Sequence, residues 1–204
     1  MVNNVMKILL LFIPIFILIS SHLGASAGNY LNKEKLVKKM QTGGLVLYFR
    51  HASTEKDYAD QVDADVNDGS TQRVLSEEGW HEAVHIGRAI RFHKIPVSKV
   101  ISSEYFRAWQ TAWLAFQKYE KNKDFNFLPS EDYTKEQVAL MNKRVTPYLS
   151  TKHKLDGNLI IVAHDDPFES ATGIYPEPMG ICFIIEPLGS GKFKILGHIS
   201  PTEW

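Results

Sequence analysis

Four side chains that can take part in phosphoryl chemistry each come at or just after an apolar run of the chain. Arg50 and His51 stand side by side after one run, His164 ends another, and Arg107 follows a third. Guanidinium groups match phosphate oxygens in pairs, and a neutral imidazole is a good nucleophile. If these groups met in space, they would form a pocket for a dianion, most simply a phosphoryl group.

The apolar runs have the length of strands that are covered on both faces, and helical patterns lie between them. This alternation predicts an α/β fold, a three-layer αβα sandwich with a largely parallel central sheet. The carboxyl ends of parallel strands face one crevice, so the four side chains can converge there. A "GSG" turn at 189–191 predicts an antiparallel edge hairpin. The expected strands are 45–49, 99–103 and 158–163, and the expected helices are 32–44, 76–96, 104–119 and 134–149, the last interrupted near Pro147.

The N-terminus has the pattern of a signal peptide. Lys7 precedes the run "ILLLFIPIFILIS", and "ASA" at 25–27 supplies small residues for cleavage. The run is about a dozen residues long, short of the roughly 20 that span a bilayer, although an uncleaved anchor stays open. We therefore predict a signal peptide over 1–27, one domain over 28–204, and export to the periplasm or the medium. Cys182 is the single cysteine, so no intramolecular disulfide can form.

The overall charge argues against partners that are held by bulk electrostatics. The 204 residues include 23 Lys and Arg and 23 Asp and Glu, so any anion site must be local. We expect a small phosphorylated substrate as the partner, no nucleic acid, and no stable membrane insertion after signal cleavage. His81 and His85 are four residues apart on an expected helix, and the sequence offers no evident third ligand beside them. The sequence therefore predicts no metal site.

Four stretches, in order along the chain, resemble the signatures of the histidine phosphatase superfamily, the phosphoglycerate mutase-like fold. The family's Arg-His-Gly motif stands here as Arg50-His51-Ala52, a change from one small residue to another. The export signal makes the chain similar to small exported bacterial members. The stretches are "LYFRHAST" (47–54), "LSEEGWHEAVHIGRAI" (75–90), "VISSEYFRAWQTA" (100–112) and "IIVAHDDPF" (160–168).

The resemblance implies a metal-independent phosphomonoester hydrolase that needs no cofactor. His51 would form a phosphohistidine intermediate, and Arg50, Arg107 and His164 would hold the phosphoryl oxygens. Nearby arginines would lower the pKa of His51 and keep it neutral. The substrate would be a sugar phosphate or other small phosphate, for example a lipopolysaccharide heptose phosphate.

Several roles stay open. Asp165, directly after His164, ranks slightly ahead of Glu131 as the proton donor for the leaving group, and Asp132 is a further candidate. Thr54 could donate to a phosphate oxygen, and Arg73 could reach the rest of the substrate. Two alternative functions also stay open: a non-catalytic phosphate-binding or interaction module on the same fold, and a phosphohistidine-protein phosphatase, which an export signal disfavours.

Overall fold

The computed structural model describes most of the chain beyond the expected signal peptide. It covers residues 30–55, 59–61, 64–129, 132–153 and 156–204, so the segment 1–27 lies outside the described residues. Across these ranges, no helix combines the length and the apolar composition that a membrane span requires.

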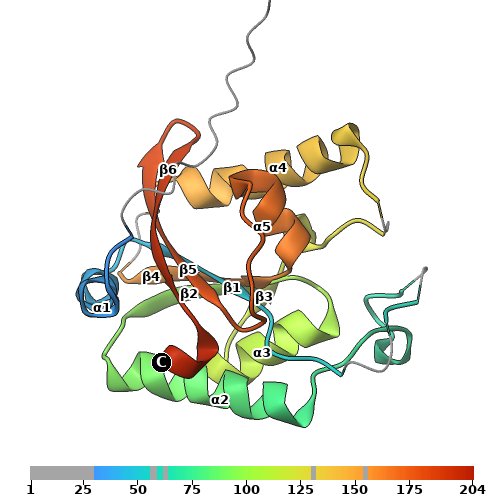
Figure 1. Cartoon of the computed structure of the whole chain (residues 1–204), viewed down its shortest axis with the longest axis horizontal. Coiled ribbons are helices and arrows are strands. Elements are labelled where there is room, and N and C mark those ends of the chain that lie inside the picture. Colours follow the sequence, from blue (N-terminus) through green and yellow to red (C-terminus); the bar gives the residue numbers. More distant parts are fainter. Residues whose placement is uncertain (1–29, 56–58, 62–63, 130–131, 154–155) are drawn as a thin grey trace, which may run out of the picture.

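Six strands form a single mixed sheet (Figure 1). Their order is β3-β2-β4-β1-β5-β6, with β1 to β4 parallel to one another and β5 antiparallel to both β1 and β6. The prediction of a largely parallel sheet with an antiparallel edge hairpin is therefore confirmed. The strands are β1 (Val46–Arg50), β2 (Val97–Ser102), β3 (Glu120–Lys121), β4 (Asn158–Ala163), β5 (Cys182–Gly189) and β6 (Lys192–Ile199).

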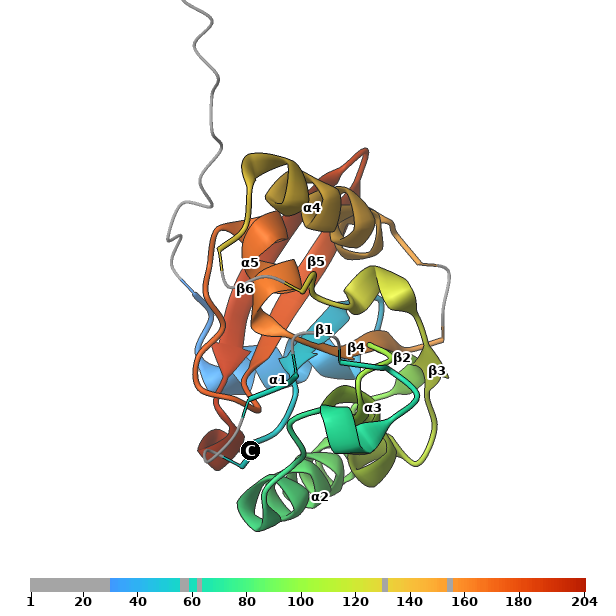
Figure 2. The same ribbon diagram turned by 90° about the vertical axis from the view of Figure 1, so that its right-hand side faces the viewer.

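Helices cover both faces of the sheet and complete the predicted three layers. Figures 1 and 2 show α2 and α3 on one face and α4 and α5 on the other. The helices are α1 (Lys33–Gln41), α2 (Glu77–Phe92), α3 (Phe106–Phe116), α4 (Lys135–Ser150) and α5 (Asp165–Thr172), with short 3-10 turns at Gly69–Thr71, Lys123–Phe125 and Pro201–Glu203.

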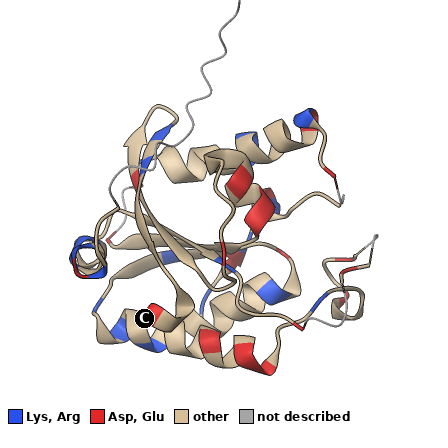
Figure 3. Cartoon of the chain, viewed as in Figure 1, with Lys and Arg blue, Asp and Glu red and all other residues tan. Residues whose placement is uncertain are grey.

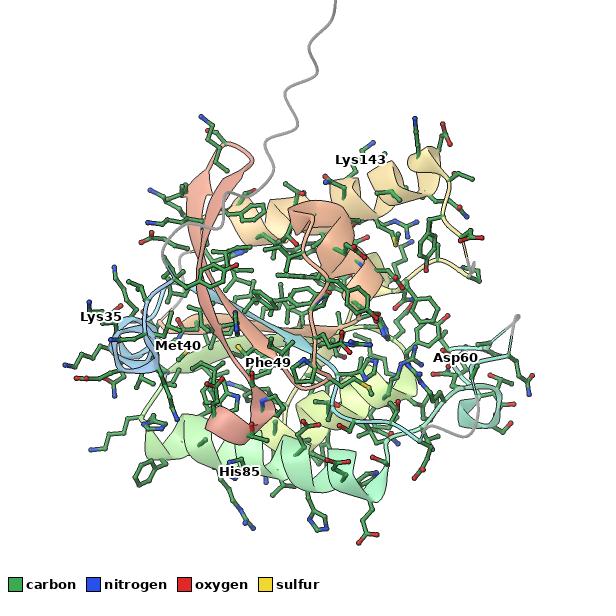
Figure 4. All side chains as sticks on the ribbon, viewed as in Figure 1. Lys35, Met40, Phe49, Asp60, His85 and Lys143 are labelled. Atoms are coloured by element: carbon green, nitrogen blue, oxygen red, sulfur yellow. The ribbon has the colours of Figure 1, made fainter. Side chains whose placement is uncertain are left out.

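The core is divided by the sheet into two apolar clusters. Successive residues of β1 point to opposite faces, so Phe49 belongs to the same cluster as Met40 of α1 (both labelled in Figure 4), while the ring of Tyr48 packs against Phe168 of α5. Every residue of β1 and β4 is buried. This double burial explains why these strands appear in the sequence as continuous apolar runs and not as alternating ones.

Helix α4 differs from the expectation, because Pro147 does not interrupt it. The helix continues to Ser150, and the carbonyl of Pro147 accepts from the amide of Thr151 at 3.0 Å. A proline removes one backbone donor, but Val145 and Leu149 on either side are fully buried. Burial of this apolar face outweighs the lost hydrogen bond, which sequence propensity alone cannot show.

The first turn of α2 fixes the segment that follows His51. Ser76 caps the helix by accepting from the amide of Gly79 at 3.1 Å. Gly79 lies so close to the loop that a Cβ there would come within 1.9 Å of the Ser53 carbonyl oxygen. Glu82 accepts from the Ser53 amide at 2.7 Å. The backbone after β1 is therefore held in place by α2.

Candidate active site

The ends of neighbouring strands bring the four predicted side chains together. β1 and β4 are paired in parallel with Arg50 opposite Ala163, so His51 and His164 follow adjacent strand ends. Their ring centroids are 5.4 Å apart. Arg107 comes from the first turn of α3, and its Nε lies 3.1 Å from Nε2 of His51. All four side chains are buried.

The hydrogen bonds of His51 determine which ring nitrogen carries the proton. Nδ1 lies 2.9 Å from the carbonyl oxygen of Ala52, which can only accept, so Nδ1 is protonated. Nε2 accepts from Arg107 and therefore presents a lone pair. Burial, followed by the charges of Arg107, Arg50 and Arg73, lowers the pKa of His51 well below its usual value. The imidazole is neutral, and its unprotonated Nε2 has the lone pair that a nucleophile needs.

The proton of His164 can be assigned in the same way. Asn126 Oδ1 accepts from the amide of Glu104 at 2.9 Å and from the Ser103 hydroxyl at 2.8 Å. Because that hydroxyl has one hydrogen, Nε2 of His164 must donate to the Ser103 oxygen, 2.7 Å away. Burial and the charge of Arg107 lower the pKa of His164, so Nδ1 is unprotonated, and it has no hydrogen-bond partner.

Two aromatic side chains hold Arg107 and His164. The rings of Tyr105 and Phe127 each lie 5.2 Å from the Arg107 guanidinium. The same rings contact His164, with centroid distances of 5.3 and 4.8 Å. These contacts restrict both side chains to one orientation toward His51. Phe127 comes from a segment that the sequence marks only as a loop.

Arg50 is fixed by protein acceptors at one edge of its guanidinium. Nη1 donates to the carbonyl of Pro176 at 3.0 Å, and Nη2 lies 2.7 Å from Oδ2 of Asp165. The hydroxyl of Tyr175 also donates to that carboxylate oxygen, at 2.8 Å. Nε of Arg50 is buried and has no hydrogen-bond partner. A buried donor without an acceptor is costly, so this position is suited to an incoming oxygen atom.

Arg107 also has a carboxylate partner, which the sequence analysis missed. Asp60 (labelled in Figure 4) follows β1, and its Oδ1 lies 2.8 Å from Nη1 of Arg107. The same oxygen accepts from the amide of Arg73 at 2.8 Å. Arg73 belongs to the site as well, because its charge lowers the pKa of both His51 and His164, and its Nε is buried without a partner.

The remaining predicted residues lie differently. Thr54 is buried, and its hydroxyl points to Sδ of Met179 at 3.5 Å. Asp132 is exposed on the segment before α4, whereas Glu131 lies outside the described residues. The phosphate contact of Thr54 and the acid role of Glu131 or Asp132 therefore stay predictions.

The helix pair His81 and His85 is exposed on α2. In the described ranges, no group of three His, Cys, Asp or Glu side chains is placed to hold a metal ion.

Comparison with known proteins identifies the fold. No family model matches the sequence, and no curated protein matches it. Among solved structures, the protein histidine phosphatase SixA complexed with tungstate superposes with a TM-score of 0.57 and 15% identity, over 78% of this chain and 97% of that one. The chain has the histidine phosphatase fold. A phosphoserine phosphatase mutant from Entamoeba histolytica, in complex with phosphoserine, shares it with a TM-score of 0.58 and 14% identity, over 78% of this chain and 98% of that one.

A phosphoglycerate mutase from Thermus thermophilus also shares the histidine phosphatase fold, with a TM-score of 0.51 and 17% identity over 76% of this chain and 98% of that one. At such identities the likeness concerns the fold, and the function must be argued from the side chains. The expectation of a phosphoglycerate mutase-like architecture, which the motifs suggested, is confirmed.

Proposed function

We propose that this protein is a phosphatase of the histidine phosphatase superfamily that hydrolyses phosphomonoesters through a phosphohistidine on His51. One observation carries the proposal: the unprotonated Nε2 of His51 lies in a cluster with three arginines, of which Arg50 and Arg107 are buried and Arg73 is partly buried. Two of them, Arg50 and Arg73, have a buried Nε without an acceptor. Neutral imidazole beside unsatisfied guanidinium donors is the arrangement that attack on a phosphoryl group requires.

The reaction follows from these positions. Arg50, Arg73 and Arg107 donate to the phosphoryl oxygens and balance the charge of the transition state. The Nε2 lone pair of His51 forms the N–P bond while the ester P–O bond breaks. The leaving oxygen takes up one proton from a general acid of the site. Water then attacks the phosphorus of the phosphohistidine, which breaks the N–P bond, restores neutral His51 and returns one proton from the water to that acid.

Fixed cations support the proposal that the chemistry is metal-independent. The electrostatic role that a divalent ion has in many phosphoryl-transfer enzymes can be filled by the guanidinium groups of Arg50, Arg73 and Arg107. A chelator should then leave turnover unchanged, and loss of activity that a divalent ion restores would contradict this part of the proposal.

Asp165 remains our candidate for the proton donor. Its Oδ2 takes both the Arg50 ion pair and the Tyr175 hydrogen bond, so Oδ1 is the oxygen that could face a leaving group. These contacts also give Asp165 a second role as the partner that orients Arg50. Glu131 and Asp132 stay alternatives.

Location and substrate are parts of the same proposal. The signal-like pattern of residues 1–27 supports export, and a small exported phosphatase could act on a sugar phosphate such as a lipopolysaccharide heptose phosphate. N-terminal sequencing of the protein from an exporting host should find a start near Gly28. Intact Met1 in the soluble cytosolic fraction would rule out export by this signal.

The decisive experiment tests His51 as the covalent nucleophile. Purified 28–204 should release phosphate from an aryl phosphate, and His51→Ala should lower turnover by about 10⁴-fold or more. The acid-labile phosphoenzyme that can be trapped from the unaltered protein should be absent in the variant. His81→Ala, which changes an exposed histidine, is the matched control and should keep activity.

Other outcomes of that experiment would favour the alternatives. Label that remains on the His51→Ala variant would place the nucleophile elsewhere. Phosphate binding without any turnover would favour a non-catalytic module. The likeness to the protein histidine phosphatase SixA favours one further substrate, phosphohistidine in a protein. A higher kcat/KM on a phosphohistidine protein than on sugar phosphates would support it.

A further inference from the structure

A cavity of about 580 Å³ lies between α4 and α5. The two helices run side by side in Figures 1 and 2. This volume falls within the range of roughly 300 to 1,000 Å³ that small-molecule sites occupy. The cavity extends along α5 from Asp166 to Gly173, and Tyr133 and Met141 line the side opposite α5. It is distinct from the histidine cluster, whose residues do not line it.

The chemistry of the lining selects an organic cation. Asp166 and Glu169 contribute carboxyl groups, Tyr133 a ring and Met141 a thioether, and the lining residues include no Lys, Arg or His. Figure 3 shows the acidic stretches of α5 in red. An ammonium group can pair with a carboxylate and pack against an aromatic face, whereas an anion would be repelled.

Asp166 is short of a hydrogen-bond donor when it is ionised. The Tyr133 hydroxyl lies 2.8 Å from the carbonyl oxygen of Leu128 and 3.1 Å from Oδ2 of Asp166, but it has one hydrogen for the two acceptors. Burial, together with the like charge of Asp165, raises the pKa of Asp166 to about 6. An ammonium group would supply the missing donor and offset the free-energy cost of the partly buried charge.

The cavity and the phosphoryl site share the first turn of α5. Asp165 and Asp166 are consecutive residues in the first turn of α5. Asp165 pairs with Arg50, and the charge of Arg50 also acts on Asp166, whose pKa it lowers. Because of this shared turn, a molecule with its phosphoryl group among the arginines would reach the cavity by extending past the start of α5.

We propose that this cavity binds the leaving-group part of the substrate and that the substrate is a phosphate ester with an ammonium group, paired with Asp166. The assignment of the phosphoryl half rests on the proposed function. The cavity itself rests on its own lining, so the two can be tested apart.

The test uses ligands that cannot be hydrolysed. ω-Aminoalkyl phosphonates with two to six carbons between phosphorus and nitrogen are compared by calorimetry with ω-hydroxyalkyl phosphonates of equal length. Because a charge-assisted hydrogen bond replaces a neutral one, the amino ligand should bind about 10- to 100-fold more tightly at one preferred length. Equal affinity of the two series at every length would overturn the proposal.

Two variants assign the preference to the cavity. Asp166→Asn should abolish the preference for the amino ligand. Glu169→Lys changes an exposed side chain, so it should not disturb folding, and it should make the amino ligand bind more weakly than its hydroxyl counterpart. Glu186→Gln on β5 removes a charge of the same sign elsewhere and should keep the preference. A preference that survives both cavity variants would place the ammonium elsewhere and refute the assignment.

Failure of the proposed function gives a different result. Hydrolysis of aryl phosphate without any ammonium preference would refute this inference alone. A length-dependent ammonium preference without turnover of any ester would support the cavity and count against the phosphatase. If phosphonates fail to bind and no ester is hydrolysed, both are wrong.

Discussion

Arg50 and Arg107 come from different elements, the end of β1 and the first turn of α3, and they are held in different ways. Both are buried and both have a carboxylate partner, Asp165 for Arg50 and Asp60 for Arg107. Arg50 keeps its Nε free of any partner, whereas Nε of Arg107 donates to Nε2 of His51. The Arg50 side is therefore ready for a phosphoryl oxygen, and the Arg107 side is closed on the nucleophile.

This difference shows what substrate binding must change. The lone pair of His51 that would attack phosphorus is occupied by Arg107, so a phosphoryl group must take that donor for itself before reaction. Arg50 can accept the phosphoryl group without breaking a protein contact. We infer that Arg50 mainly contributes to binding, while Arg107 also controls the state of the nucleophile.

Among variants that distinguish the two arginines, the largest expected effects come from removal of either one. Arg50→Ala and Arg107→Ala should each lower kcat/KM by about 10²- to 10³-fold, since each loses a donor to the developing charge. The pH profile should separate them. Arg107 lowers the pKa of His51 more than Arg50 does, so Arg107→Ala should move the acid limb of kcat/KM to higher pH by the larger amount.

The sign of this shift is fixed by the reactive form. His51 reacts when neutral, and loss of a neighbouring positive charge raises its pKa toward the usual value, so more of it is protonated at mildly acidic pH. Arg107→Lys keeps the positive charge but loses the paired N–H donors of the guanidinium. This variant should therefore keep the acid limb of kcat/KM at its original pH while its turnover falls. If the acid limb of kcat/KM moved by the same amount in Arg50→Ala and Arg107→Ala, the two arginines would not differ in their control of the His51 pKa.

The next effect tests Asp165 on the Arg50 side. If Asp165 is the proton donor, Asp165→Asn should lower turnover of an alkyl phosphate by about 10²-fold and that of nitrophenyl phosphate far less, because nitrophenolate leaves without a proton. The basic limb of the pH profile should flatten as well. Equal losses on both substrates would show that Asp165 acts only by orienting Arg50. Tyr175→Phe is the control: it removes one hydrogen bond to Asp165 but keeps the carboxyl group, so it should lower turnover of the alkyl phosphate by less than Asp165→Asn does.

Proton uptake tests the assignment of His164. Its Nδ1 is unprotonated and unpartnered in the free protein, and a bound dianion would favour a protonated, donating Nδ1. Binding of inorganic phosphate above pH 7 should therefore take up as much as one proton. Calorimetry in buffers of different ionisation enthalpy measures this number, and His164→Gln should abolish the uptake. No uptake in the unaltered protein would mean that His164 stays neutral.

The parts of this molecule that were predictable from sequence are those encoded locally. β4 begins and ends where its apolar run does, at 158–163, and α2 begins at Glu77, within one residue of the expected start. Arg50, His51 and His164 could be found because they directly follow continuous apolar runs. The sequence predicts that they converge because the carboxyl ends of parallel strands face one crevice, and the parallel pairing of β1 with β4 does bring them together.

The parts that were missed depend on contacts between distant segments. Asp60 lies in a polar stretch with no periodic pattern, and only the fold brings it to Arg107, 47 residues further along the chain. Tyr175 reaches Arg50 across 125 residues. Phe127 and the course of α4 through Pro147 are likewise set by packing. No local signal marks such residues, because their neighbours are decided by tertiary structure.

The smallest expected effect is the most informative about the closed side. Asp60 holds Nη1 of Arg107 with a carboxylate that a phosphoryl oxygen must replace or share. In Asp60→Asn the competing charge is gone, and inorganic phosphate or tungstate should bind about threefold to tenfold more tightly. Asp65→Asn is the matched control, since it makes the same change in the same segment at a carboxylate that accepts from the amide of Asn67. A general effect of charge would tighten binding in both variants. Weaker binding in Asp60→Asn alone would instead mean that Asp60 orients Arg107 for phosphate binding. Arg107 would then bind a phosphoryl oxygen without rearrangement, as Arg50 does.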